Sequence, residues 1–180
     1  MKFEDLKKAE RAMMFAIERH GAQKYGDQPY MVHLTQVVNV LASFGYSDNL
    51  TIISAAWLHD VLEDTGTTRE ELREVFGVPI EYVVWCVTAD QGGNRMQRLR
   101  TIIPRILSSE AALIVKLADR IANTEECKRN NLKLHRAYAA ENVYFRECFY
   151  RRKTQANIAP MWQRLIAANK ADKVETEVTK

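Results

Sequence analysis

The chain is poor in the features that mark secreted, membrane-spanning and repetitive proteins. Its 180 residues include only three cysteines, seven glycines and four prolines. Cys86, Cys127 and Cys148 are widely spaced and form no CxxC pair, which is typical of reduced thiols in a cytosolic protein. No apolar run approaches the roughly 20 residues of a membrane span, and the acidic, amphipathic N-terminus lacks a signal-peptide pattern. We therefore predict a cytoplasmic protein with no membrane partner.

A strong charge of either sign is also missing. The chain has 26 Lys and Arg against 23 Asp and Glu, a net charge of +3, and its basic residues are spread out apart from small clusters such as Arg95, Arg98 and Arg100. This balance argues against a nucleic-acid partner. It still allows a small anion, which needs only two or three cations in one cleft.

Alternating strand patterns of useful length are absent as well, and nearly every segment repeats its apolar residues with helical period. Thr67 or Thr68 can cap one helix that Gly77 ends. Residues 90–97, DQGGNRMQ, predict an irregular loop, and the charged residues 171–180 predict a frayed tail. We predict one all-α domain over residues 1–170, with about eight to ten helices. The expected helices cover 9–20, 32–45, 49–62, 67–77, 79–89, 109–127, 131–151 and about 158–169.

The helix predicted over 49–62 carries an unusual group of ionisable side chains in the stretch AWLHDVLEDTGTT. At 100° per residue, His59, Glu63, Asp60 and Asp64 fall within an arc of about 140°, and the apolar residues occupy the other side. A solvated charged face usually mixes in Lys or Arg for pairing. Neither type occurs between Ser54 and Thr68.

Three uncompensated carboxylates beside an imidazole repel one another unless a cation lies among them. Oxygen and nitrogen ligands of this kind suit Mn²⁺, Fe²⁺, Zn²⁺ or Mg²⁺, so the pattern predicts a metal site. One helix cannot complete the coordination shell, and other helices must contribute. His33 is a candidate because it begins an amphipathic helix directly after the turn-like GDQPY.

A second candidate is Asp119, which lies at the edge of the apolar stripe of IVKLADRIAN. Lys116 lies one turn before it and Asn123 one turn after it, so the three form a ladder along a buried margin. From this pattern alone, Asp119 is either a partner for a nearby Arg or a metal ligand.

Together these residues resemble the HD-domain metal phosphohydrolases, and more narrowly the hydrolase domain of the RelA/SpoT family with its small single-domain alarmone hydrolases. The resemblance covers roughly residues 10–150 and implies an HD-domain helical bundle. Five segments carry it in order: GDQPYMVH, AAWLHDVLEDT, EELREVFG, VVWCVT and IVKLADRIANTEE.

The resemblance implies one metal ion, Mn²⁺ in this family, with Mg²⁺, Fe²⁺ and Zn²⁺ as alternatives. It implies hydrolysis of the 3′-pyrophosphate of guanosine tetra- or pentaphosphate, (p)ppGpp, to pyrophosphate and GDP or GTP. The implied metal ligands are His33, His59, Asp60 and Asp119. The implied catalytic pair, which positions and activates water, is Glu63 and Asp64, while Asn123 contacts the nucleotide and Lys116 supports the site.

One loop departs from the family pattern. Family members commonly carry an Arg–Lys pair in the loop that holds guanine, whereas this chain has the shorter HGAQKYGDQPY. Lys24 and Tyr25 lie there, and the Tyr25 ring can stack on a base. Selectivity between guanine and adenine therefore stays open, and so does oligomeric state. Candidate cations for the phosphates are Lys24, Arg95, Arg98 and Arg100.

Two other hypotheses remain at this point. An HD-type phosphohydrolase could keep the metal and act on an adenosine alarmone, NADPH or a nucleoside monophosphate. A non-catalytic nucleotide-sensing module could hold the ligand without cleaving it, and such a module would be expected to lose Glu63, Asp64 or a metal ligand. All of these residues are present.

Overall fold

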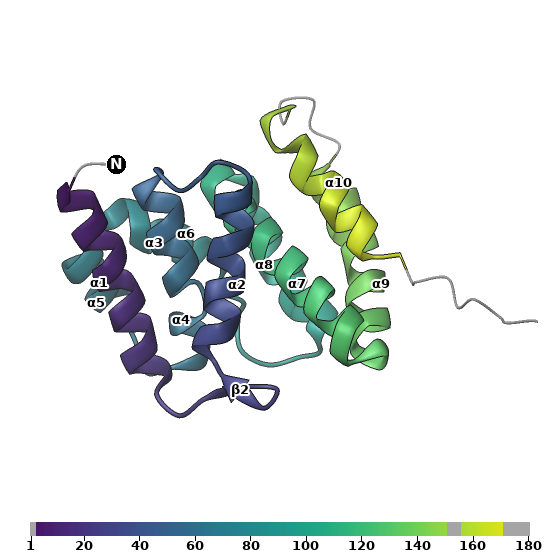
Figure 1. The fold of residues 1–180 in the computed structure, drawn as a ribbon, viewed down its shortest axis with the longest axis horizontal. Coiled ribbons are helices and arrows are strands. Elements are labelled where there is room, and N and C mark those ends of the chain that lie inside the picture. Colours follow the sequence, from purple (N-terminus) through teal and green to yellow (C-terminus); the bar gives the residue numbers. More distant parts are fainter. Residues whose placement is uncertain (1–2, 151–155, 171–180) are drawn as a thin grey trace, which may run out of the picture.

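The computed structural model describes residues 3–150 and 156–170, and within these ranges the chain is an all-α bundle (Figure 1). The described part contains ten α-helices, one short 3₁₀ helix and a two-stranded hairpin. Their bounds are α1 Phe3–His20, β1 Lys24–Tyr25, β2 Gln28–Pro29, α2 Met31–Ser43, α3 Leu50–Leu58, α4 Val61–Asp64, α5 Arg69–Phe76, α6 Val78–Val87, α7 Arg95–Leu107, α8 Glu110–Asn130, α9 Leu132–Phe149, η1 Ala156–Ile158 and α10 Ala159–Ala168.

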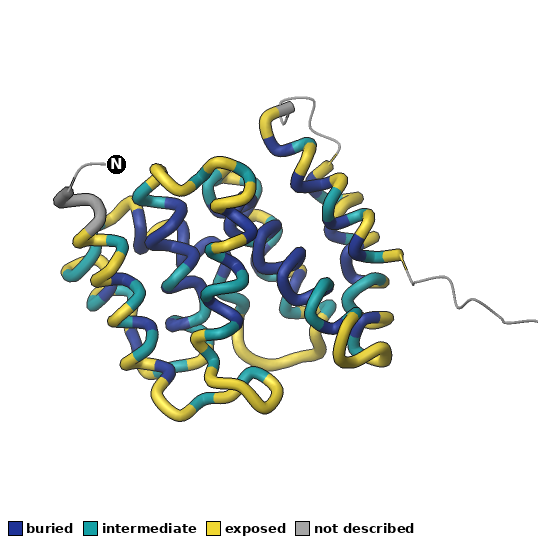
Figure 2. The backbone as a smooth tube through the Cα atoms, viewed as in Figure 1, coloured by how far each residue is buried: buried dark blue, intermediate teal, exposed yellow. Residues whose placement is uncertain are grey.

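Helix α8 forms the centre of the bundle. It packs against α2, α3, α6, α7, α9 and α10, and α1 covers the far side of α3. Most of α8 is buried, as the dark blue of its tube shows (Figure 2). Burial on all sides explains why α8 carries small and branched apolar residues around much of its circumference. Its few ionisable side chains are therefore held inside the protein.

The predicted all-α fold is confirmed, and the number of helices lies within the predicted range. Helix α7 was not predicted. Pro104 lies inside it and has no amide hydrogen to donate, a feature that disfavours a helix interior. The helix forms because Leu99, Ile102 and Ile106 bury one face. The predicted loop at residues 90–97 therefore ends at Asn94, which caps α7 through a capping box with Gln97.

The sequence signals at the ends of α5 are confirmed. The hydroxyl of Thr68 accepts a hydrogen bond from the amide of Glu71, and Gly77 ends the helix with a positive φ of 86°. A positive φ is favourable for glycine because glycine has no Cβ atom. The frayed tail predicted at 171–180 lies outside the described residues.

A short hairpin enters the bundle between α1 and α2. Lys24 pairs with Pro29, and Tyr25 pairs with Gln28, around Gly26 with a φ of 60°. Strands of two residues give no alternating pattern, which is why the sequence did not reveal them. The hairpin holds Tyr25 and Tyr30 beside the start of α2.

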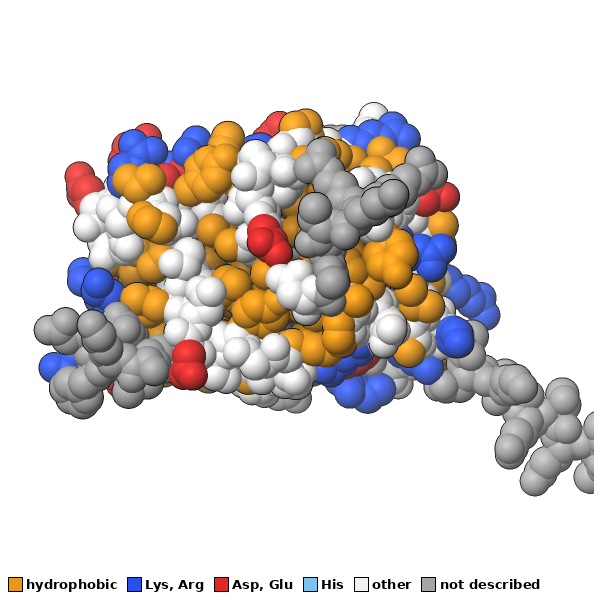
Figure 3. All heavy atoms as spheres, turned by 90° about the horizontal axis from the view of Figure 1, so that it is seen from above, with side chains coloured by type: hydrophobic (Ala, Val, Ile, Leu, Met, Phe, Trp, Pro, Cys, Tyr) orange, Lys and Arg blue, Asp and Glu red, His pale blue; other side chains and the backbone are white. Residues whose placement is uncertain are grey.

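Large exposed hydrophobic side chains are dispersed over several helices. Seen from above, hydrophobic side chains cover much of the middle of the surface, and Lys and Arg lie mostly toward its edges (Figure 3).

No helix among the described residues is long and apolar enough to cross a membrane. The large exposed hydrophobic residues are Met14, Met31, Val78, Tyr82, Leu132, Val143 and Tyr150.

Candidate active site

The chain turns at His59 and Asp60, so the helix predicted over 49–62 is not continuous. Helix α3 ends at Leu58, and α4 begins at Val61. The ring nitrogen Nδ1 of His59 lies 2.8 Å from the carbonyl oxygen of Ala56, the acceptor that the amide of residue 60 would use in an uninterrupted helix. The side chain competes with the backbone for this acceptor. The four ionisable groups therefore lie on two segments and not on one helical face.

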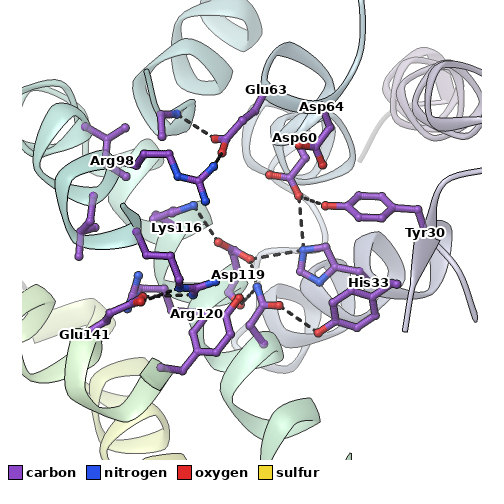
Figure 4. Close-up of a pocket in the computed structure, with 17 residues that line it drawn as sticks. Tyr30, His33, Asp60, Glu63, Asp64, Arg98, Lys116, Asp119, Arg120 and Glu141 are labelled. Atoms are coloured by element: carbon purple, nitrogen blue, oxygen red, sulfur yellow. Dashed lines mark hydrogen bonds and ion pairs between the residues drawn. The ribbon is translucent and has the colours of Figure 1, made fainter. Parts of the chain in front are cut away.

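Three histidine and aspartate side chains meet at this turn. His33 reaches it from α2 (Figure 4), and its Nε2 lies 3.2 Å from Nε2 of His59. Oδ2 of Asp60 lies 3.0 Å from the His59 nitrogen and 3.6 Å from the His33 nitrogen. One ligand atom from each residue lies within 4.8 Å of the others, a spacing that could hold a metal ion.

Asp119 adds a fourth group from α8. Its Oδ1 lies 3.4 Å from Nε2 of His33 and 3.8 Å from Nε2 of His59. The structure thus brings together all four residues that the sequence singled out as metal ligands, from α2, the α3–α4 turn and α8.

The chemistry of these groups fits a divalent cation. His59 donates its Nδ1 hydrogen to the Ala56 carbonyl, which leaves Nε2 of the neutral ring with a lone pair. That lone pair faces Nε2 of His33 and two carboxylates. Hydrogen-bond acceptors that face one another with no donor between them repel each other, and a cation among them removes this repulsion. Imidazole nitrogens and carboxylate oxygens are ligands for Mn²⁺, Fe²⁺ and Zn²⁺.

Without a metal, protons take the place of the cation. Burial lowers the pKa of His33, but its hydrogen bonds to Asp119 and Asp60 and their charges outweigh burial and raise that pKa to about 9. Burial lowers the pKa of His59, but the charge of Asp60, the hydrogen bond to Asp60 and the charge of Asp119 together outweigh burial and raise that pKa too. Burial alone would raise the pKa of Asp60, but the neighbouring histidines hold it well below its usual range.

Lys116, Asp119 and Asn123 form the ladder that their spacing predicts. Nζ of Lys116 lies 2.9 Å from Oδ2 of Asp119, and Nδ2 of Asn123 donates to Oδ1. The cationic partner of Asp119 is therefore a lysine, and the same carboxylate also faces the histidines. Burial lowers the pKa of Lys116, but the charges of Asp119, Asp60 and Glu63 raise it to about 12.

Glu63 and Asp64 both line the pocket in front of the metal ligands, but they differ in setting. Oε2 of Glu63 accepts a hydrogen bond of 2.9 Å from the amide of Ala89, and Oε1 lies 3.4 Å from Nη1 of Arg98. Burial raises the pKa of Glu63 despite these contacts. Asp64 is exposed, and its Oδ2 accepts from Gln23 at 2.8 Å. Glu63 is therefore the better held of the two carboxylates.

The pocket has a volume of about 330 Å³ and contains most of the predicted substrate contacts. Tyr25, Lys116 and Asn123 line it, and the Tyr25 hydroxyl donates to Oδ1 of Asn123 at 2.9 Å. Lys24 does not line it and is exposed on β1. Of the other candidate cations, Arg95 and Arg98 line the pocket, whereas Arg100 is exposed on α7.

Sequence reasoning missed four polar residues that line the pocket. The hydroxyl of Tyr30 donates to Oδ2 of Asp60 at 2.5 Å. Farther along the pocket wall, Glu141 from α9 bonds Arg95 at 2.6 Å and lies 3.4 Å from Arg120. Only the position of Tyr30, three residues before His33, gave a local signal. The remaining three residues, which α8 and α9 supply, are Arg120, Tyr138 and Glu141.

Comparison with known protein families identifies the class. A family model described as HD domain matches residues 12–144, so the chain belongs to the HD-domain family. This domain implies binding of a divalent metal, and the cluster of His33, His59 and Asp60 could hold such an ion.

Within this family the chain is similar to pyrophosphohydrolases of animals and bacteria. It is 37% identical over 119 residues to guanosine-3′,5′-bis(diphosphate) 3′-pyrophosphohydrolase MESH1 of Danio rerio, across 64% of this chain and 66% of that protein. The MESH1 of Xenopus tropicalis is 36% identical over 122 residues, across 66% of this chain and 68% of that protein. A guanosine-3′,5′-bis(diphosphate) 3′-pyrophosphohydrolase of Aquifex aeolicus is 38% identical over 121 residues, across 64% of this chain and 17% of that protein.

A solved structure supports the same likeness in three dimensions. It is described as "A metazoan ortholog of SpoT hydrolyzes ppGpp and plays a role in starvation responses". The TM-score is 0.75 at 25% identity, and the likeness covers 89% of this chain and 94% of that one. It therefore includes nearly all of both chains.

Proposed function

We propose that this protein is a metal-dependent (p)ppGpp 3′-pyrophosphohydrolase that uses one Mn²⁺ ion. The observation that carries the proposal is the convergence of His33, His59, Asp60 and Asp119 at one end of a pocket that Glu63 also lines. Relatives named as guanosine-3′,5′-bis(diphosphate) 3′-pyrophosphohydrolases support the choice of substrate. The expected products are pyrophosphate and GDP or GTP.

In this proposal the four ligands hold the metal, and a partner fixes the orientation of three of them; Nδ1 of His33 has no hydrogen-bond partner among the described residues. The Ala56 carbonyl orients His59, the Tyr30 hydroxyl holds Asp60, and Asn123 and Lys116 hold Asp119. Such outer partners set both the geometry and the basicity of metal ligands. When bound, a divalent metal polarises a phosphoryl oxygen and lowers the pKa of water.

Glu63 is the proposed general base. The Ala89 amide fixes one carboxylate oxygen and leaves the other toward the pocket. Burial raises the pKa of Glu63, which brings it closer to the neutral range in which a base works best. A bond forms between the water oxygen and the phosphorus next to the ribose, and the bond from that phosphorus to the 3′-oxygen breaks. Glu63 takes a proton from the attacking water, and the departing 3′-oxygen receives a proton from solvent.

Asp64 and Tyr25 have supporting roles in the proposal. Asp64 accepts from Gln23 and lines the same pocket, where it can orient the water from a second side. The Tyr25 ring lies 4.8 Å from the His33 ring, and its hydroxyl bonds Asn123. Tyr25 thus stands between the metal ligands and the residue proposed to contact the nucleotide, where a base can stack on its ring.

We also propose that residues 1–170 act as one HD domain in the cytoplasm. The buried hydrophobic residues form a single cluster that includes side chains from α1 to α10, which supports one domain. Cys86, Cys127 and Cys148 are free thiols, which favours a reducing compartment.

The deciding experiment incubates the purified protein with ppGpp and Mn²⁺, with and without a chelator, and identifies both products. Pyrophosphate and GDP in equal amounts, with loss of both on chelation, are expected. Release of orthophosphate without pyrophosphate would contradict the proposed reaction. A parallel panel of an adenosine alarmone, NADPH and nucleoside monophosphates measures base and phosphate selectivity.

A further inference from the structure

Arg98 is a cation of the pocket wall whose task remains unassigned. It lies on α7, and its side chain extends into the pocket between Glu63 and Lys116 (Figure 4). Its Nη1 lies 3.4 Å from Oε1 of Glu63, a long ion pair, and 39% of its side chain is exposed. Arg98 therefore touches the proposed base weakly and has room to move.

The other cations of this pocket are held more firmly. Lys116 lies 2.9 Å from Asp119 with 15% of its side chain exposed. Arg95 bonds Glu141 at 2.6 Å, and its guanidinium lies 4.3 Å from the centre of the Tyr138 ring. The Arg120 side chain is only 5% exposed and is bonded to partners on α9. Arg98 is thus better placed than these three to change its partner when an anion enters.

Glu63 itself does not depend on Arg98 for its position. The Ala89 amide fixes Oε2, and the side chain of Gln91 donates to the backbone carbonyl of Glu63 at 3.1 Å. If Arg98 left, Glu63 would stay in place, and Oε1 would be open to the pocket. A guanidinium that stayed beside Oε1 would favour the charged carboxylate and weaken it as a proton acceptor.

We propose that Arg98 binds the terminal phosphate of the substrate's 3′-pyrophosphoryl group and thereby leaves Glu63, whose Oε1 becomes free to accept the proton of the attacking water. This inference rests on the proposed function. A terminal phosphate carries more charge and more acceptor oxygens than a carboxylate, and guanidinium binds it through two parallel hydrogen bonds. Only a pyrophosphoryl substrate supplies this group, so Arg98 selects a 3′-diphosphate over a 3′-monophosphate.

The test compares Arg98→Met with Arg100→Met, a matched change on the same helix at an exposed residue that does not line the pocket. Guanosine 5′-diphosphate with a 3′-diphosphate or a 3′-monophosphate serves as substrate. In Arg98→Met, kcat/KM for the diphosphate is expected to fall about 100-fold, the order of a charge-assisted hydrogen bond to phosphate, while the monophosphate value stays within about threefold. Arg100→Met should leave the ratio unchanged, and Arg98→Lys should restore part of it.

An equal loss for both substrates, or an unchanged ratio, would overturn the proposal. A second measurement does not need turnover: calorimetric binding of inorganic pyrophosphate to the metal-loaded protein should weaken at least tenfold in Arg98→Met and not in Arg100→Met. Equal binding to both variants would also overturn it. If the wild-type protein cleaves neither nucleotide, the proposed function fails, and pyrophosphate binding alone decides the role of Arg98. Thermal unfolding of each variant identifies any that fails to fold.

Discussion

Two helical regions supply three of the four candidate metal ligands, and they present their side chains in different ways. Helix α8 is unbroken over Glu110–Asn130 and arranges Lys116, Asp119 and Asn123 along one side at spacings of three and four residues. The other region ends one helix at Leu58 and starts the next at Val61, with the two ligands of the turn between them.

This difference shows what each geometry can do. Residues at i, i+3 and i+7 on a straight helix form a row, in which neighbours orient the central group. Adjacent residues on an uninterrupted helix point about 100° apart, and here His59 and Asp60 lie where one helix ends and the next begins. In this protein the row holds Asp119, and the interruption brings His59 and Asp60 to the same point.

Removal of one ligand from each region should have the largest effect. Asp60→Ala and Asp119→Ala are each expected to lose the metal and to lower pyrophosphate release at least about 1,000-fold, because a metal contributes several kcal/mol to such reactions. Metal analysis beside the kinetic assay measures both. If either variant keeps its full metal content but loses turnover, the substituted aspartate is not a metal ligand.

Glu63→Gln distinguishes the role of the proposed base Glu63 from that of the nearby proposed metal ligands His59 and Asp60. The amide keeps the size of the side chain but cannot take a proton, so turnover should fall roughly 100- to 10,000-fold with metal content unchanged. Normal turnover in this variant would exclude Glu63 as the base. Gln91→Ala is a useful comparison, because it removes only a contact to the Glu63 backbone.

Asn123→Ala tests whether Asn123 orients the proposed metal ligand Asp119 on the same helix. Asn123 bonds both Asp119 and the Tyr25 hydroxyl. Loss of an outer partner typically lowers metal affinity about 10- to 100-fold. A metal titration measures this effect, and a raised KM with unchanged metal affinity would instead assign Asn123 to the nucleotide alone.

Metal affinity should rise with pH, because metal and proton compete at His33, which lies between the two regions. The pKa of His33 in the metal-free protein is raised to about 9, so below this pH a proton must leave as the metal enters. Affinity is expected to increase about tenfold per pH unit and to level off above that pKa. Calorimetry in two buffers of different ionisation enthalpy counts the released proton, and a count of zero near neutral pH would refute the competition.

Thr68→Ala gives the smallest effect and serves as a control outside the site. It removes the cap of α5, where the hydroxyl accepts from the Glu71 amide at 3.2 Å. The free energy of unfolding should fall by about 1 kcal/mol, with metal affinity and turnover unchanged. Urea unfolding measures the first quantity. Loss of metal in this variant would show that the α5 end is coupled to the site.

The sequence predicted groups of neighbouring residues well. The Lys116–Asp119–Asn123 ladder follows from helical spacing, and the Thr68 cap and the Gly77 end follow from local hydrogen bonding and backbone conformation. The four metal ligands and Glu63 with Asp64 came from charge crowding together with the resemblance to a known family. The roles of these residues remain predictions, although the structure brings them together.

What the sequence could not reveal depends on contacts between distant segments. Helix α7 forms despite Pro104 because its apolar face is buried, and the helix break at His59 was not visible in the apolar pattern of residues 49–62. Glu141 meets Arg95 and Arg120 only because α9 packs beside α7 and α8.

The sequence by itself determined the all-α fold and the two ends of α5, because helical period and capping act over a few residues. It indicated the candidate metal ligands through charge crowding together with the family resemblance. The tertiary structure alone decided which oxygen of Glu63 faces the pocket, which partner holds each ligand, and that Arg98 rather than Lys24 lies beside the proposed base. These features depend on side chains from different helices that meet within a few ångströms, and such distances are set by packing.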